Sequence, residues 1–138
     1  MPTTDLLTLG DEEFVSLTTF RRSGEGVATP VWVARDGDAL VVITGDGSGK
    51  VKRLRREPRV VLRACDRQGR VSPDAPEAEG RGEVVHDLGS QARPRRALAA
   101  KYGLQWRLVG LLGAAGRVGR LLGRPARERV ILRIRGTV

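Results

Sequence analysis

The sequence is poor in cysteine and in long hydrophobic runs, and each shortage argues against a class of protein. Cys65 is the only cysteine, so an intramolecular disulfide cannot form and a cysteine-based zinc cluster is not expected. No segment approaches the roughly 20 uncharged apolar residues that span a bilayer. Residues 1–10 lack the basic and then apolar pattern of a signal peptide. We therefore expect a cytoplasmic protein without a metal centre.

Aromatic residues are also scarce, which bears on the meaning of the positive charge. The formal net charge is +9, yet aromatic residues make up only 4% of the chain. Proteins that bind single-stranded nucleic acid stack bases on aromatic side chains, and little is available here. The excess is regional, because residues 91–129 contain ten Lys/Arg and a single acid, Glu128. We expect non-specific affinity for polyanions and no specific nucleic-acid partner, with a polyanion-binding module as a rival function.

The chain does contain a series of short β-strand patterns. Its 138 residues and hydrophobic fraction of 40% suit a single domain over residues 1–138. Apolar residues alternate from Val27, and Asp36-Gly37 then predicts a hairpin with a type I′ turn, in which both central residues have positive φ. Several short strands with tight turns favour an antiparallel sheet closed into a barrel. The predicted strands are residues 14–20, 27–34, 39–44, 59–64, 80–86 and 129–135.

Two helical segments interrupt the strands. The first spans about Lys50 to Glu57 and ends before Pro58. The second lies between Ser90 and Arg124, with a break near Gly103. Beyond the break, residues 104–124 carry an apolar stripe at spacings of three and four, although five glycines weaken the helix. Core packing is the favoured role of this stripe, and a subunit interface or a membrane-surface contact is the alternative. Residues 66–79 are predicted to be an exposed loop.

The most informative chemistry lies in residues 44–53, TGDGSGKVKR. A strand ends, glycines free the backbone, and a helix begins with several cations. Free N–H groups and the positive end of the helix dipole make such a start an anion site. Ser48 can cap the helix or donate its hydroxyl to a phosphate oxygen. The spacing is not that of a Walker loop. On spacing alone, a glycine-rich turn before a solvated basic helix remains an equal alternative.

Several segments carry a resemblance to a known family. Residues 44–62 resemble the phosphate-binding strand–helix–strand of the pyridoxamine 5′-phosphate oxidase-like superfamily, with Thr at the strand end, Ser before Lys, and Pro-Arg-Val after the helix. Residues 14–44 resemble its first three strands, with Thr-Pro-Val-Trp at the centre. Residues 96–103 resemble its penultimate helix. The chain is most similar to the actinobacterial flavin/deazaflavin oxidoreductases, especially their B-type deazaflavin branch.

The resemblance implies a fold and a binding site. The fold would be mainly β with α, an antiparallel split β-barrel of FMN-binding type, with a short phosphate-binding helix and a longer helical segment before the last strand. A homodimer would form a cofactor groove at each subunit boundary. Residues 48–50 and Arg53 would hold the phosphate, and the backbone of residues 30–32 and the strand end near Thr44 would lie against the ring. The implied cofactor-binding residues are Pro30, Val31, Trp32, Thr44, Ser48, Gly49, Lys50 and Arg53.

One position departs from the family pattern. The flavin-mononucleotide oxidases typically have a basic residue before the lysine, where this chain has Gly49. Loss of that cation weakens the case for a compact phosphate monoester such as FMN. A deazaflavin, coenzyme F-420, carries a phosphodiester and a polyglutamate tail, so its charge is more dispersed. The arginines of residues 93–107 are candidates to attract that tail.

The resemblance therefore predicts a deazaflavin-dependent reductase. It would transfer hydride from reduced coenzyme F-420 to a small unsaturated or quinone-like organic substrate. An FMN-binding oxidoreductase of the same fold and a non-catalytic cofactor carrier are the alternatives. The sequence assigns no catalytic residue, since His86 and Tyr102 are only weak candidates for a proton donor. Cys65 has no evident activating base and is expected to be inert packing.

Overall fold

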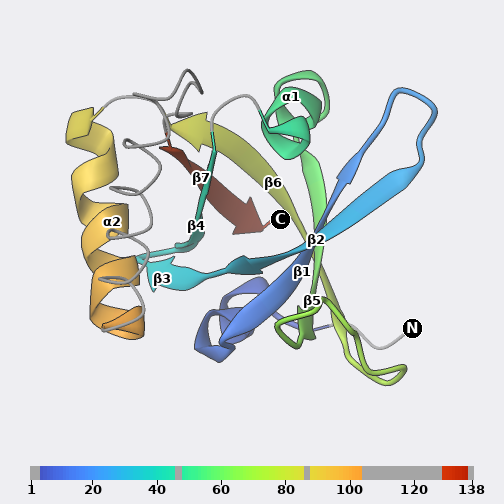
Figure 1. Cartoon of the computed structure of the whole chain (residues 1–138), viewed down its shortest axis with the longest axis horizontal. Helices are drawn as coiled ribbons and strands as arrows, with labels where there is room; N and C mark the ends of the chain where they lie inside the picture. Colours follow the sequence, from blue (N-terminus) through green and yellow to red (C-terminus); the bar gives the residue numbers. More distant parts are fainter. Residues whose placement is uncertain (1–3, 46–47, 86–87, 104–128, 137–138) are drawn as a thin grey trace, which may run out of the picture.

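The computed structural model describes residues 4–45, 48–85, 88–103 and 129–136, and its main feature is one curved antiparallel sheet (Figure 1). Within these ranges the chain forms seven strands, two α-helices and a 3₁₀ helix. In chain order they are η1 (Leu6–Asp11), β1 (Phe14–Phe20), β2 (Gly26–Trp32), β3 (Ala34–Asp36), β4 (Ala39–Gly45), α1 (Gly49–Arg56), β5 (Arg59–Cys65), β6 (Glu77–Val85), α2 (Leu88–Tyr102) and β7 (Arg129–Gly136).

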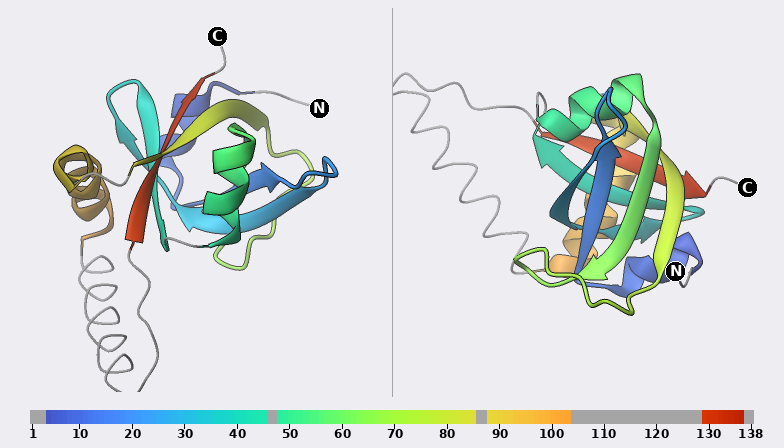
Figure 2. Two further views of the ribbon diagram at one scale, coloured as in Figure 1. Left: turned by 90° about the horizontal axis from the view of Figure 1, so that it is seen from above. Right: turned by 90° about the vertical axis from the view of Figure 1, so that its right-hand side faces the viewer.

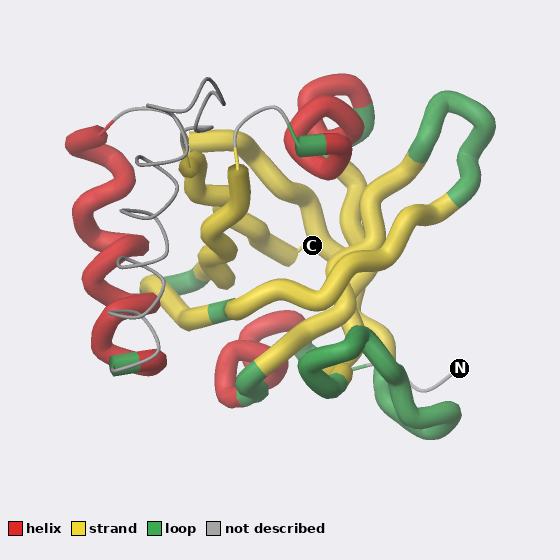
Figure 3. The backbone as a smooth tube through the Cα atoms, in the orientation of Figure 1, coloured by secondary structure: helices red, strands yellow, loops and turns green. Residues whose placement is uncertain are grey.

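The strand order confirms the predicted antiparallel split barrel. Neighbouring strands follow the order β2-β1-β5-β6-β7-β4-β3, and every pair is antiparallel. The sheet bends strongly, as the tube in Figure 3 shows, but β2 and β3 remain its two edges. It is therefore open, whereas the strand pattern alone predicted a closed barrel. Pro30 lies opposite Ser16 on the edge strand β2, where the missing N–H of proline is tolerated.

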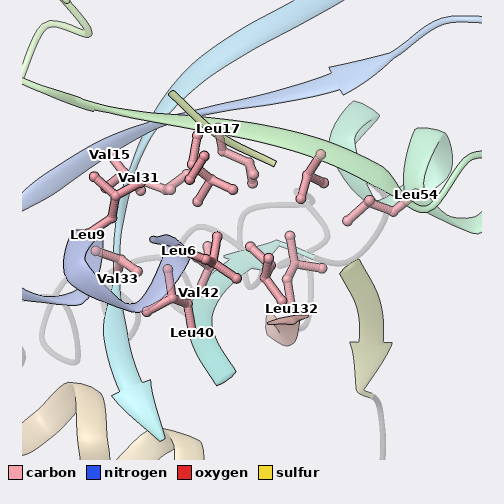
Figure 4. Close-up of a cluster of buried hydrophobic side chains, with 14 of the residues drawn as sticks. Leu6, Leu9, Val15, Leu17, Val31, Val33, Leu40, Val42, Leu54 and Leu132 are labelled. Carbon is pink, nitrogen blue, oxygen red and sulfur yellow. The ribbon is translucent and has the colours of Figure 1, made fainter. Parts of the chain in front are cut away.

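Period-two alternation decides which side chains fill the barrel. In β4, Leu40 and Val42 enter the inner core, while Val41 packs in a second cluster beneath α2. Neighbouring β7 places Val130, Leu132 and Ile134 in the inner core, and Ile131 joins the second cluster. Figure 4 shows the inner core, which includes Leu6 and Leu9 of η1. Helix η1 was not predicted from the sequence, and it contributes these two leucines to the inner core.

Three predictions differ from the structure in detail: the continuity of one strand, the start of another, and the type of one turn. The strand expected over residues 27–34 is interrupted at Val33, because side chains from α2 replace its strand partners there, as described below. Strand β6 begins at Glu77, so the loop ends earlier than residue 79. The predicted hairpin forms, with Asp36 opposite Ala39. Its turn is not type I′, because Gly37 has a φ of 64° and Asp38 has no positive φ.

The two α-helices have the predicted order but different surroundings. Helix α1 ends at Arg56, just before Pro58, and buries Val51 and Leu54 against the barrel. Helix α2 ends at Tyr102, and Gly103 follows with a φ of 49°, which confirms the predicted break. The apolar stripe of residues 104–124 and His86 lie outside the described residues. None of the described helices has the length and apolar character needed to cross a membrane.

Candidate phosphate site

The candidate site lies where α1 meets the hairpin that joins β1 and β2. Helix α1 contacts β1, and Figure 2 shows the helix and the hairpin from two further directions. Because Val51 and Leu54 anchor α1 on β1 and β6, the helix face at spacings of three and four from Gly49 is turned toward the hairpin. An open cavity of about 450 Å³ lies there, which we call the cationic cleft. It is lined by Arg21, Arg22, Gly49, Lys52, Arg53 and Arg56.

The cationic cleft has no counter-charge among the described residues. Arg53 Nε donates to Thr19 Oγ1 at 2.6 Å, and Arg56 Nη2 donates to the Phe20 carbonyl at 2.6 Å. Neither side chain, nor any other cation of the cleft, forms an ion pair with an acid in the described part of the chain. Elsewhere, Arg59, Arg93, Arg133 and Arg135 do have carboxylate partners. Five guanidinium or ammonium groups therefore converge on one open space and repel one another.

Ser48 occupies the N-cap position of α1 without acting as a side-chain cap. Its backbone is extended, with φ −64° and ψ 158°, and its side chain makes no capping hydrogen bond. The hydroxyl oxygen is nevertheless buried and has no hydrogen-bond partner in the part of the chain that the structure describes. An unsatisfied buried hydroxyl is destabilising by roughly 1–3 kcal/mol. Of the two roles predicted for Ser48, the helix cap is absent, and the hydroxyl remains available for an anion at the start of α1.

Lys50 lies two residues after Ser48 and is half-buried. Its pKa lies below the ordinary value, first because burial disfavours the charged form and second because of the positive charge of Arg53. The pKa of Arg53 is lowered in the same sense by burial and then by Arg21. Lys50 does not line the cationic cleft itself. A bound anion near the start of α1 would relieve the repulsion that both shifts record.

The four ring-contacting residues predicted from the resemblance lie elsewhere. Val31 is buried in the inner core and Pro30 is exposed on the sheet edge. Trp32 stacks on Tyr102, with ring centroids 4.5 Å apart and an angle of 13° between planes. Thr44 is half-buried near the end of β4. None of these four lines the cationic cleft. The side chains of Val31 and Trp32 are used by the fold, so these residues can offer a ligand mainly their backbone.

The cleft also contains cations that were not assigned from the sequence. Lys52 and Arg56 could have been found, because they follow Gly49 at positions i+3 and i+7 on one helix face. Arg21 and Arg22 gave no such signal, since they come from the hairpin after β1 and reach α1 only in the folded chain.

The remaining candidates have structural surroundings. The Tyr102 hydroxyl accepts a hydrogen bond from Val33 N at 2.9 Å, and its proton lies within reach of the Glu13 and Val33 carbonyls. Burial is the main reason that the pKa of Tyr102 rises to about 12, so the phenol holds its proton near neutrality. Burial and then Asp66 raise the pKa of Cys65, which agrees with an inert thiol. Arg93, a candidate for contact with a cofactor tail, pairs with Asp36 at 2.6 Å.

Comparisons with known proteins identify the class. The model of the pyridoxamine 5′-phosphate oxidase family matches residues 6–137. With its open antiparallel barrel and the strand–helix–strand around α1, this chain is a split-barrel protein. It belongs to the pyridoxamine 5′-phosphate oxidase family. No curated protein matches the chain.

Solved structures agree on the fold at low sequence identity. A conserved hypothetical protein from Mycobacterium tuberculosis is similar with a TM-score of 0.65 and 20% identity, covering 94% of this chain and 76% of that chain. An FAD-binding protein from Mesorhizobium loti has a TM-score of 0.63 and 15% identity, covering 94% and 83%. A structure described as an F-420 reductase has a TM-score of 0.53 and 22% identity, covering 95% and 92%.

Proposed function

We propose that the start of α1 binds the phosphate of a flavin-type cofactor, and that the protein is a deazaflavin-dependent reductase. The observation that carries the binding site is the buried hydroxyl of Ser48, which has no hydrogen-bond partner among the described residues and lies beside the cationic cleft, whose cations have no acid partner in the same part of the chain. A phosphate fits this environment, because it accepts hydrogen bonds from hydroxyl, backbone N–H and cationic groups and supplies the missing negative charge.

Each residue would have a separate part in holding the phosphate. Ser48 donates its hydroxyl, and the first N–H groups of α1 donate along the helix axis. Lys50 contributes a point charge, while Arg53 presents a planar fork of donors. The negative charge of a bound phosphate monoester or diester would offset the repulsion among the cations of the cleft. This offset would favour binding.

The finer assignment to coenzyme F-420 has its own support. Gly49 stands where a basic side chain is typical of the FMN oxidases, and one structural neighbour is described as an F-420 reductase. Another neighbour is described as FAD-binding, so the family fold accommodates more than one flavin. When bound, the deazaflavin would supply a hydride to a small unsaturated or quinone-like substrate. The protein would contribute placement of the ring and exclusion of water.

The first experiment is a titration of the purified chain with coenzyme F-420 and, separately, with FMN, followed by cofactor fluorescence. We expect micromolar binding of coenzyme F-420, weaker binding of FMN, and a loss of at least about tenfold in Lys50→Ala, as for a charge-assisted hydrogen bond. Arg55→Ala is the matched control, because it removes one positive charge from the same helix without altering the lining of the cationic cleft.

The outcomes separate the alternatives. Tighter binding of FMN would move the protein to the FMN-dependent oxidoreductases of this fold. Binding of coenzyme F-420 without hydride transfer to any quinone-like acceptor would indicate a cofactor carrier. Binding of neither cofactor would refute the proposal, and equal losses in Lys50→Ala and Arg55→Ala would indicate general polyanion attraction. The homodimer stays a prediction, which sedimentation equilibrium tests directly.

A further inference from the structure

The guanidinium group of Arg53 lies directly over the backbone of Gly49. A Cβ atom at residue 49 would stand 2.7 Å from Arg53 Nη1 and 3.4 Å from both Cζ and Nη2. A contact of 2.7 Å is too short for a real Cβ, so a side chain at residue 49 and the present position of Arg53 exclude each other. Gly49 has no positive φ, so the conformation of its backbone does not require glycine. The space taken by Arg53 is what glycine provides.

A buried threonine fixes the other end of the same guanidinium group. Thr19 is 1% exposed and occupies the inward face of β1, two residues beyond Leu17. Its hydroxyl accepts the Arg53 Nε–H at 2.6 Å. A hydroxyl on an apolar inner face is destabilising unless it has a partner, and here Arg53 is that partner. The sequence separation of 34 residues means that only the folded barrel brings the two together.

This anchoring leaves the functional end of the guanidinium group available. Arginine has five N–H donors, of which only the Nε–H is used by Thr19. The described residues provide no carboxylate for the Nη groups. A planar pair of Nη donors matches two oxygens of one phosphate. Arg53 is therefore held by its inner nitrogen, with its outer nitrogens over the residue that starts α1.

We propose that Thr19 is a positioning residue for phosphate recognition. Together with the absent side chain at residue 49, it places the Arg53 cation where a basic residue 49 would otherwise stand. Arg53 thus reaches the space beside residue 49 from one helical turn later, and the site still has one cation fewer than a chain with basic side chains at both positions. This inference rests on the proposed phosphate site, and it adds two residues, Thr19 and Gly49, whose role is to hold Arg53 in place.

The test measures binding of coenzyme F-420 and FMN by fluorescence in wild type, Thr19→Val and Thr19→Ser. We expect Thr19→Val to weaken binding about tenfold, because Arg53 loses its anchor while keeping its charge. Thr19→Ser keeps the hydroxyl and should recover most of the affinity. Thermal melting curves of each variant establish that the barrel is folded.

A charge transposition provides a second, independent measurement. Arg53→Ala should weaken binding by at least about thirtyfold. Adding Gly49→Arg in that background should recover about tenfold, since the new side chain enters the space that Arg53 has left. Gly49→Arg with Arg53 still present should weaken binding, because the two side chains compete for one space.

Nitrogen-15 NMR of the arginine side chains gives a readout that does not depend on a cofactor. In wild type, the Arg53 Nε–H should exchange slowly with water, and this protection should vanish in Thr19→Val and persist in Thr19→Ser. Wild-type affinity in Thr19→Val, alongside weak binding by Arg53→Ala, would overturn the positioning role and leave the phosphate site intact. No binding of either cofactor by wild type would overturn both proposals.

Discussion

Helices α1 and α2 are both basic, but their cations differ in the partners that the rest of the described chain provides. On α2, Lys101 Nζ donates to the carbonyl oxygens of Gly10 and Val33 at 2.6 Å and also to that of Glu12. On α1, the cations that line the cleft have no acid partner within the described ranges, and the N-cap hydroxyl of Ser48 has no hydrogen-bond partner there. Polar groups that are satisfied within the chain stabilise the fold, whereas the unsatisfied groups at the start of α1 are consistent with the proposed anion site.

A buried hydroxyl is associated with each helix, that of Tyr102 with α2 and that of Thr19 with α1, and the two hydroxyls have different hydrogen-bond partners. The Tyr102 hydroxyl hydrogen-bonds to the backbone N–H and carbonyl of Val33, where the strand is interrupted between β2 and β3. The Thr19 hydroxyl instead accepts a hydrogen bond from the side chain of Arg53, which also lines the cationic cleft. Variants of α2 should therefore change the stability of the fold, and variants of α1 should change the affinity for an anion.

The largest effect on stability is expected for Lys101→Met. Methionine retains the apolar stem but leaves the carbonyls of Gly10, Glu12 and Val33 without their charged donor. We expect a loss of about 3 kcal/mol in the free energy of unfolding, since hydrogen bonds to charged groups contribute more than neutral ones. Urea denaturation measures this value. Unchanged stability would show that water replaces the ammonium group and that α2 does not differ from α1 in this respect.

Tyr102→Phe should have the next largest effect. Phenylalanine keeps the stack on Trp32 but leaves the Val33 N–H unpaired, which should lower the free energy of unfolding by about 2 kcal/mol. Affinity for the cofactor should stay unchanged in the folded variant. A large fall in reductase turnover at full stability would instead assign the Tyr102 hydroxyl to proton transfer. Helix α2 would then have a functional role as well as a structural one.

Lys50→Met should lower cofactor affinity and leave stability nearly unchanged, the reverse of the pattern expected for the α2 variants. Because Lys50 is a half-buried cation beside Arg53, its removal should leave stability within about 0.5 kcal/mol of wild type or raise it slightly. Cofactor affinity should be lost. Denaturation and fluorescence titration of the same preparation measure both quantities. A loss of stability similar to that of Lys101→Met, without a loss of affinity, would place α1 among the structural elements.

The smallest expected effect is a pH dependence of binding. The pKa of Lys50 in the free protein lies below its ordinary value of 10.5, and a bound phosphate would raise it. Binding therefore takes up a proton above the free-state pKa, and affinity should fall as pH rises through that value. Titrations from neutral pH up to the ordinary lysine value of 10.5 measure the fall. Lys50→Arg is the control, because arginine stays charged over this range. An equal fall in the control would assign the titration to another group.

Much of the fold and part of the site could be predicted from the sequence. Period-two alternation located most of the strands, because burial on one face leaves a direct record in the order of residues. Pro58 and Gly103 marked the helix ends for local steric reasons. Ser48, Gly49, Lys50 and Arg53 could be grouped as one candidate site from the sequence, since an anion site at a helix start is built from residues that are close in sequence.

The features that can be predicted from the order of residues are therefore local: the strands, the helix ends and a glycine-rich turn with a cationic helix after it. The folded chain is needed to show that Arg21 and Arg22 lie beside this helix, that Thr19 holds Arg53, and that Tyr102 interrupts the strand at Val33. The last two contacts join residues separated by 34 and 69 positions, so no local pattern records them. They exist because the curved sheet brings distant strands and helices within hydrogen-bonding distance.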